Sequence, residues 1–348
     1  MKAIIHNIRI SAISACLPTN VQELMSLSGE FGEKEVASII KATGVERVRL
    51  ADNKQTASDL CYEAATYLLK EEQIERNKID GLVFVSQTAD YTLPSTSVIL
   101  QDRLGLTRET VCIDIHYGCS GYIYGLFQAA LWINSGGCEN VLLLAGDTSS
   151  KMINARDKSL RMVFGDCGTA TLVTRGTASI GFSVCSDGSG YDRLIIPAGG
   201  FRLPSSEETK MLLFDEDRNG RTQEDMFMDG MAIFDFAITN VPQNVNDLIE
   251  QMQWRKEDIA LFAMHQANKF MVNCIRKKIM VEAEKMPVNI ANYGNTGPAS
   301  IPLLLSDVCS VSQYDLDKVI LSGFGVGLSW GSVACSLCDT HFYEPLNK

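Results

Sequence analysis

The chain has 348 residues, of which 46% are hydrophobic and 21% charged, the balance of a globular protein. Its formal charge of -11 argues against a nucleic-acid-binding surface, because phosphate binding needs a cluster of positive charge. The N-terminal sequence MKAIIHNIRI lacks the apolar core of a signal peptide, and no stretch is long and apolar enough to cross a membrane, so we expect a soluble, cytoplasmic protein.

Short runs of branched apolar residues alternate with longer helix-like segments, which is the pattern of an α/β fold. Most of these runs are too uniformly apolar to have a solvent-exposed face, so we expect a sheet covered by helices on both sides. The expected strands, in chain order, are GLVFVSQ (81–87), TVCIDIH (110–116), NVLLLAG (140–146), IALFAMH (259–265) and KVILSGF (318–324).

An internal repeat is visible at an offset close to half the chain length. The stretch 78–90 resembles 256–268, where pairing Asp80 with Asp258 gives an offset of 178, and pairing Asn140 with Lys318 gives 178 again. We therefore predict two copies of one α/β unit, residues 1–178 and residues 179–348.

The stretch from Gly199 to Asp229, rich in charge, Gly and Pro, breaks the strand–helix rhythm and is expected to form a long surface excursion. Within it, DEDRNG (215–220) imitates the start of a calcium loop, but Met226 stands where a bidentate Glu is needed. The eleven cysteines are scattered, and the pair Cys335 and Cys338 lies in an apolar, strand-like run. The sequence therefore predicts no disulfide framework and no metal site.

Cys119 lies where the expected strand 110–116 gives way to a helix that ends at the Gly136-Gly137 pair. Gly118 and Gly121 permit a tight turn there. The free N–H groups of a helix N-terminus stabilise an anion, so we expect a lowered thiol pKa, although burial acts in the opposite direction. The helix is apolar nearly all round and is expected to run through the core. The local sequence leaves two interpretations open, a buried inert thiol or a nucleophile.

A nucleophilic thiol needs a partner that handles protons or donates hydrogen bonds, and the chain offers four histidines. His265 closes the strand IALFAM and opens the turn HQAN, at the carboxyl end of a strand where active sites of α/β proteins collect. His116, three residues before Cys119, is interpreted as a structural histidine with its hydrogen bonds satisfied. The other two, His6 and His341, lie in the first expected strand and in the polar tail.

Two glycine-containing loops complete the set of candidate site segments. In NYGNTGPASIPLLL (292–305), Asn295 lies in a rigid loop before a helix, where its carboxamide either points into a cavity or caps a turn. The stretch GFGVGLSWG (323–331) has the spacing GxGxG rather than the GxGxxG of dinucleotide-binding proteins. A glycine-lined turn with free backbone N–H groups suits an oxyanion hole better than a cofactor site.

The motifs YGCSGY, HQAN, YGNTGPAS and GFGVGLSWG, in this order and spacing, resemble those of the β-ketoacyl-ACP synthase III group of thiolase-fold condensing enzymes, over essentially the whole chain. The resemblance implies a five-layered αβαβα sandwich made of two similar halves, the first carrying the nucleophilic cysteine and the second the histidine and asparagine. It places the catalytic set on Cys119, His265 and Asn295. It also implies an oxyanion hole formed by the backbone N–H groups of Cys119 and Val326, with substrate-binding positions at Gly325 and Gly327.

By this resemblance, Cys119 accepts an acyl group from a thioester, and the acyl group then undergoes decarboxylative Claisen condensation with a malonyl thioester. The implied substrates are acyl-CoA or acyl-ACP and malonyl-ACP, with no cofactor, in fatty-acid initiation or in a specialised lipid or polyketide-type pathway. The alternative is an acyltransferase that passes the acyl group to an oxygen or nitrogen acceptor without decarboxylation. A Cys-His hydrolase would need a water path to the acyl-enzyme. A non-catalytic partner subunit typically lacks the cysteine.

The sequence departs from the family pattern at the surface that grips CoA. Ser38 and Ala42 stand where the family usually has a tryptophan, which stacks on adenine, and an arginine, and Phe270 stands where an arginine is common. We therefore expect the acyl donor to arrive on a carrier protein or as another thioester.

Two further positions are implied to meet the substrate or its carrier. Lys269, with Arg276, Lys277 and Lys278, lies near the expected mouth of the site, as either a docking patch for an acidic acyl carrier protein or a solvated helix face. Leu93 matches a family position that gates the acyl pocket, often across the interface of a homodimer. A leucine there leaves room for an acyl group that is longer or more branched than acetyl.

Overall fold

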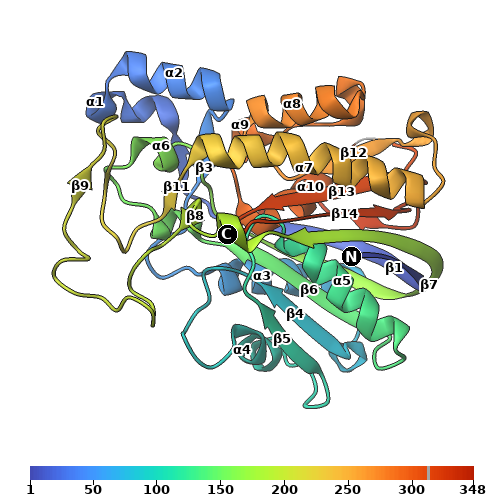
Figure 1. The fold of residues 1–348 in the computed structure, drawn as a ribbon. Coiled ribbons are helices and arrows are strands. Elements are labelled where there is room, and N and C mark those ends of the chain that lie inside the picture. Colours follow the sequence, from blue (N-terminus) through green and yellow to red (C-terminus); the bar gives the residue numbers. More distant parts are fainter. Residues whose placement is uncertain (312–313) are drawn as a thin grey trace.

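The computed structural model describes residues 1–311 and 314–348. Within these residues, ten strands form one hydrogen-bonded sheet in which the principal strands follow the order β12-β13-β14-β7-β6-β4-β5 (Figure 1). All five strands expected from the sequence are present. The strands of this sheet are β1 (Lys2–Leu17), β4 (Gly81–Val85), β5 (Val111–Ile115), β6 (Asn140–Asp147), β7 (Cys167–Ser186), β12 (Leu261–Met264), β13 (Val319–Gly325), β14 (Ser329–Cys335), β15 (His341–Phe342) and β16 (Leu346–Asn347).

Six helices divide the molecule into layers. Helices α5 and α10 share one core cluster with side chains from both parts of the sheet, so they lie in the middle layer. Helices α3 and α4 pack on the outer face of β4 and β6, and α7 and α8 pack on the outer face of β12 and β13. The result is the predicted five-layered αβαβα sandwich. These helices are α3 (Ala57–Glu71), α4 (Thr96–Arg103), α5 (Gly121–Asn134), α7 (Gly230–Gln251), α8 (Lys269–Ile279) and α10 (Ser300–Cys309).

The two similar halves are visible in equivalent hydrogen bonds. After α3, Gln73 has a left-handed backbone (φ 54), and the next residue, Ile74, donates its N–H to the carbonyl of Leu69. Helix α7 ends in the same way 180 positions later: Gln253 has a φ of 56, and Trp254 N donates to the carbonyl of Ile249. The repeat was predicted from the sequence. The predicted offset of 178 residues is correct between β6 and β13. Between β4 and β12, the strands that pair with them, the offset is two residues larger.

The difference in offset comes from a length difference between the halves. Gly81 of β4 pairs with Val141 of β6, whereas Leu261 of β12 pairs with Val319 of β13. The segment that joins the paired strands is therefore two residues shorter in the second half, and Asp258 is not the equivalent of Asp80. The division into residues 1–178 and 179–348 stays a prediction; its boundary lies inside β7, between the residues that pair with β6 and those that pair with β14.

The stretch 199–229 forms the surface excursion expected from the sequence and projects from the left of the molecule in Figure 1. Most of its residues are exposed, but Met226 is buried and reaches the interior. The remaining short elements are β2 (Val21–Glu23), α1 (Ser28–Phe31), α2 (Glu33–Thr43), β3 (Arg47–Arg49), α6 (Lys158–Arg161), β8 (Leu194–Ile195), β9 (Leu213–Phe214), β10 (Gly220–Arg221), β11 (Phe227–Met228) and α9 (Ile290–Tyr293).

No helix among the described residues is long and apolar enough to cross a membrane.

Candidate active site

Cys119 lies in the turn that joins β5 to α5, directly before Ser120, the N-cap of that helix. The turn needs its glycines, because a Cβ on Gly118 would come within 2.2 Å of Gln87 Oε1 and a Cβ on Gly121 within 2.5 Å of Val85 Cγ1. The Cys119 side chain is 7% exposed. The predicted strand-to-helix turn is thus confirmed, and it places the thiol at the start of the central helix.

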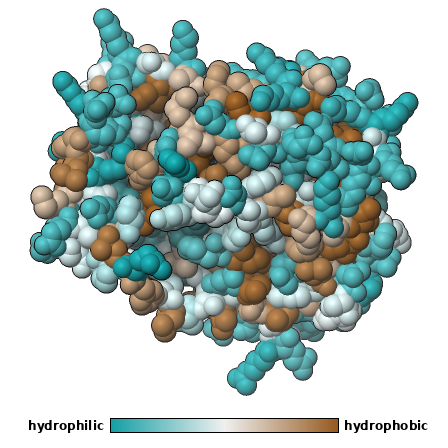
Figure 2. All heavy atoms as spheres, in the orientation of Figure 1, coloured by the Kyte–Doolittle hydropathy of each residue, from teal (hydrophilic) through white to brown (hydrophobic). Residues whose placement is uncertain are grey.

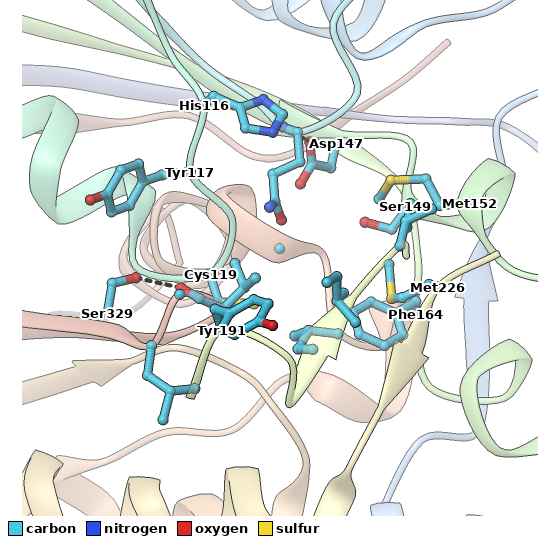
Figure 3. Close-up of a pocket in the computed structure, with 18 of the residues that line it drawn as sticks. His116, Tyr117, Cys119, Asp147, Ser149, Met152, Phe164, Tyr191, Met226 and Ser329 are labelled. Atoms are coloured by element: carbon cyan, nitrogen blue, oxygen red, sulfur yellow. Dashed lines mark hydrogen bonds between the residues drawn. The ribbon is translucent and has the colours of Figure 1, made fainter. Parts of the chain in front are cut away.

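The thiol borders a cavity of about 560 Å³. Figure 3 shows Cys119 in the centre of the view, with His116 and Asp147 above it and Met152, Phe164 and Met226 to one side. The cavity is deep enough to hold a ligand rather than a single water molecule. The sequence left open whether Cys119 only fills space; its position at this cavity favours the nucleophile.

The expected low pKa of the thiol is wrong for the protein without substrate. Burial, with a smaller contribution from the nearby Asp147 carboxyl, raises the pKa of Cys119 to about 12. The nearby Asn295 carboxamide lowers the pKa but does not offset burial. Desolvation therefore outweighs the stabilisation that a helix N-terminus provides.

Asn295 is held beside the thiol by its own backbone. Its N–H donates to the carbonyl of Val163 over 2.8 Å, and its carbonyl accepts from Gly165 N over 3.0 Å. Its side-chain Oδ1 accepts from Gly297 N over 3.0 Å. The carboxamide is thereby fixed near Cys119, whose thiol pKa it lowers.

His265 follows β12 at the carboxyl end of the strand, where the sequence predicted it. Its ring is 1% exposed, Nδ1 shares a 2.6 Å hydrogen bond with Ser300 Oγ, and the ring stands edge-on to Phe324 at 5.3 Å between centroids. Burial lowers the pKa of His265 to about 3, so the imidazole is neutral at physiological pH. Its Nε2 makes no hydrogen bond within residues 1–311 and 314–348.

The structure links the three predicted catalytic residues to different degrees. The Asn295 carboxamide lies near enough to Cys119 to lower the pKa of its thiol. His265 makes no hydrogen bond to either in the described part of the chain; it is linked to them through Ser300, which follows the Asn295 loop, and through Phe324, which precedes Gly325. Gly325 packs on the cysteine, since an added Cβ would lie 2.8 Å from Cys119 Cβ.

The hairpin between β13 and β14 supplies backbone groups to the cavity, as the glycine-lined turn predicted. Val326 and Gly327 at its tip line the cavity, whereas Gly325 lies against Cys119 itself. Neither the Cys119 N–H nor the Val326 N–H has a backbone acceptor among the residues that the structure describes, and the Cys119 N–H interacts with its own thiol. Both N–H groups thus lack a carbonyl partner, as donors of an oxyanion hole do.

Two predicted substrate-binding residues do not line the cavity of their own chain. Leu93 is 80% exposed, in the loop before α4. Lys269 begins α8 and packs its side-chain carbons against Gly44 at the end of α2. Helices α2 and α8 therefore lie next to each other, away from the inner cavity.

Sequence reasoning missed a group of polar residues at this site: Gln87, His116, Asp147 and Ser149. The interpretation of His116 as a satisfied structural histidine is wrong, because the side chain is exposed, lines the cavity and has no hydrogen bond among the described residues. Burial raises the pKa of Asp147 to about 7, although the hydrogen bonds from Gln87 N, Ser86 and Thr88 act to lower it. The signal that selected His265, a polar residue at the carboxyl end of a buried strand, also applies to Asp147.

This fold, with a cysteine at the start of the central helix and an asparagine and a histidine supplied by the second half, defines a thiolase-fold condensing enzyme, which is a transferase. Comparison with known proteins identifies the family. Residues 113–188 match the family described as 3-oxoacyl-[acyl-carrier-protein (ACP)] synthase III, and residues 249–337 match its C-terminal family.

Relatives match along most of their length. A β-ketoacyl-[acyl-carrier-protein] synthase III of Caldanaerobacter subterraneus is 34% identical over 298 residues (84% of this chain and 87% of the relative), and that of Streptococcus gordonii is 33% identical over 327 residues (91% and 94%). The crystal structure of a 3-oxoacyl-(acyl-carrier protein) synthase from Burkholderia xenovorans is 35% identical, with a TM-score of 0.92 over 100% of this chain and 99% of that one. The chain belongs to the β-ketoacyl-[acyl-carrier-protein] synthase III family.

Proposed function

We propose that Cys119 accepts an acyl group from a thioester and that the acyl-enzyme then condenses with a malonyl thioester, with loss of carbon dioxide. The observation that carries this proposal is the position of the Cys119 thiol at a cavity of about 560 Å³, beside the Asn295 carboxamide and two backbone N–H groups that lack a carbonyl partner among the described residues. The product is a β-ketoacyl thioester, made in fatty-acid initiation or in a specialised lipid or polyketide-type pathway.

In the first half-reaction, Cys119 Sγ attacks the thioester carbonyl and the carrier thiol leaves with the proton that Cys119 loses. Negative charge develops on the carbonyl oxygen. The N–H groups of Cys119 and Val326 are proposed to bind this oxyanion at the cavity that both residues line. Because burial raises the pKa of the thiol, the protonated form predominates before substrate binds, and we propose that proton loss accompanies attack.

In the second half-reaction, His265 and Asn295 hydrogen-bond the carbonyl oxygen of the malonyl thioester. Because the imidazole is neutral, Nδ1 can accept from Ser300 while Nε2 carries the proton that it donates. Two donors stabilise the enolate that forms as carbon dioxide leaves. This carbanion attacks the acyl carbonyl carbon, the bond from that carbon to Cys119 Sγ breaks, and the released thiolate takes up a proton from solvent. The reaction as proposed needs no metal ion and no organic cofactor.

A direct test follows the acyl group and the carboxyl carbon in one experiment. The protein is incubated with an acyl thioester and then with malonyl carrier protein labelled at its free carboxyl. We expect intact-mass spectrometry to show one acyl adduct on Cys119, and one labelled carbon dioxide to be released per β-ketoacyl product. Transfer of the acyl group to an oxygen or nitrogen acceptor without labelled carbon dioxide would support the alternative acyltransferase, and the absence of a stable adduct would support a hydrolase.

The proposed protein partner is an acyl carrier protein, which the names of the relatives specify for those enzymes. Its acidic surface requires local positive charge on a chain whose formal charge is -11. Lys277 and Lys278 of α8 are exposed and Lys269 lies at its start, whereas the Arg276 side chain donates to the carbonyl of Val281. We propose that the carrier protein docks on this helix. On the neighbouring α2, Ser38 and Ala42 stand at the two positions where the family usually has CoA-binding side chains.

We also propose a homodimer built on the edge strand β5. Among the described residues this strand pairs with β4 alone, and Val111 and Ile113 are 44% and 36% exposed. Figure 2 shows hydrophobic side chains in the lower half of this face, the part where β4, β5 and α4 lie in Figure 1. An exposed apolar edge strand invites pairing with a second copy, and such a dimer would turn Leu93 towards the cavity of the partner.

Replacement of Ile113 by glutamate is expected to convert the dimer to monomer at micromolar concentration, because a charge would be buried in the paired edge. Light scattering coupled to size-exclusion chromatography measures the mass. Met280→Glu, at a residue that is 78% exposed at the end of α8, is the matched control and should leave the dimer intact. A monomeric wild-type protein, or an unchanged mass of the Ile113 variant, would contradict the proposed interface.

We place this reaction in the cytoplasm. All eleven cysteines are free in the structure, six of them buried, which suits a reducing compartment.

A further inference from the structure

A group of polar side chains lines one side of the cavity that holds Cys119. We call it the polar wall: Gln87, His116, Asp147 and Ser149. These residues follow the carboxyl ends of β4, β5 and β6, which are parallel neighbours in the sheet. Figure 3 shows His116 and Asp147 on the same side of the cavity, away from Phe164 and Met226. The topology therefore gathers four polar groups at one edge of the sheet.

Most side-chain donors and acceptors of the polar wall have no hydrogen-bond partner among the described residues. Among its side chains, only the Asp147 carboxyl has hydrogen bonds within the described residues, and it uses one oxygen. Asp147 Oδ1 accepts from Ser86 Oγ at 2.8 Å, Gln87 N at 2.7 Å, Thr88 N at 3.2 Å and Thr88 Oγ1 at 3.2 Å. Oδ2 has no donor in the described part of the chain. Asp147 and Ser149 are buried, and buried polar groups favour hydrogen-bond partners, so this part of the wall is suited to hydrogen-bonding groups of a ligand.

The free oxygen of Asp147 lies close to the reacting thiol. Cys119, Asp147 and Gly297 line the same cavity, and Gly297 packs on Asp147, where an added Cβ would lie 2.9 Å from Oδ2. Gly297 N also donates to Asn295 Oδ1. The Asp147 carboxyl also raises the pKa of the thiol by its charge. An acyl chain on Cys119 thus meets the polar wall with its first carbons.

The side of the cavity that faces the polar wall is largely apolar, with Met152, Phe164, Ile195, Met226 and Leu328, although Tyr191, Ser186 and Ser329 also line the cavity. A carboxylate on the acyl chain would be repelled by Asp147, and an ammonium group would lose its hydration among these side chains without a second anion. A neutral group that both donates and accepts satisfies the polar wall, because it can donate to Asp147 Oδ2 and accept from the Gln87 carboxamide.

On the basis of the function proposed above, we propose that the acyl group accepted by Cys119 carries a hydroxyl on a carbon near the thioester, as in a short 3-hydroxyacyl group. In the transfer step, the carbonyl carbon forms a bond to Cys119 Sγ and its bond to the carrier sulfur breaks. The carrier sulfur takes up the proton that Cys119 loses. The hydroxyl is unchanged and serves for recognition.

The test compares thioesters that differ only in this hydroxyl, namely the N-acetylcysteamine thioesters of butyrate and of (R)- and (S)-3-hydroxybutyrate. These donors avoid any contribution from carrier recognition. We expect one hydroxybutyryl enantiomer to form the Cys119 adduct about tenfold faster or more than butyryl, measured by time-resolved intact-mass spectrometry. Ser149→Ala and Gln87→Leu should each lower this ratio. Ser135→Ala, at the exposed end of α5, is the matched control and should keep it.

The outcomes separate this inference from the function on which it rests. Faster or equal loading of butyryl compared with both hydroxybutyryl enantiomers would overturn the hydroxyl preference and leave the acyl-enzyme chemistry intact. A ratio that Ser149→Ala and Gln87→Leu leave unchanged would contradict recognition by the polar wall. Absence of any adduct from all three thioesters, in a protein whose Cys119 still reacts with iodoacetamide, would contradict the proposed function and the inference together.

Discussion

Replacement of Cys119 by alanine is expected to abolish formation of the β-ketoacyl product, with a fall in kcat on the order of 10⁴-fold or more, because no sulfur then holds the acyl group between the two half-reactions. The acyl adduct should disappear from the intact-mass spectrum. The fold should persist, since removal of one buried sulfur atom costs about 1 kcal/mol of unfolding free energy. Thermal unfolding of the variant checks this.

Cys112→Ala is the matched control for this experiment. Cys112 lies seven residues earlier on β5, half-buried, and does not line the cavity. Its replacement should leave adduct and product in place. An acyl adduct that persists in the Cys119 variant, or one that maps to Cys112, would assign the nucleophile to another residue.

Replacement of His265 by alanine is expected to separate the two half-reactions. Loss of one of the two donors to the malonyl carbonyl should slow condensation by roughly 10²-fold to 10³-fold. Acylation of Cys119 should change by less than about tenfold, because its oxyanion is bound by backbone N–H groups. Release of labelled carbon dioxide measures the first effect, and the rate of adduct formation measures the second.

Two further variants make this experiment decisive. His341→Ala removes an exposed histidine that hydrogen-bonds Glu72, and should leave both rates unchanged. Asn295→Ala should slow both half-reactions, because the Asn295 carboxamide also lowers the pKa of the Cys119 thiol. Equal losses in acylation and decarboxylation for the His265 variant would contradict its proposed role as a donor to the malonyl thioester.

The fold was largely predictable because buried strands have a strong local signature. Uniformly apolar runs such as NVLLLAG and KVILSGF became central strands, and the all-round apolar helix after Cys119 became part of the middle layer. The exception is β5, whose sequence VCIDI has the same apolar character although it lies at the edge of the sheet. Its exposure depends on which strands pair with it, and short sequence runs do not encode that.

The candidate site was predictable where a motif fixed a local geometry. The strand-to-helix turn placed Cys119 correctly, and the position after a buried strand placed His265. The pKa of the thiol was predicted in the wrong direction, because the degree of burial is set by residues far away in the sequence. The polar wall was missed for the same reason, since Gln87, Asp147 and Ser149 come together only through the pairing of β4 with β6.

Strand β7 runs unbroken for 20 residues, pairing with β6 along its first part and with β14 along its last, while β1 pairs with most of its length. One continuous backbone strand therefore belongs to the sheet pairing of both similar halves. Breaking the chain within β7 would leave unpaired strand edges and expose the helices of the middle layer. We therefore expect the two halves to unfold in one cooperative transition.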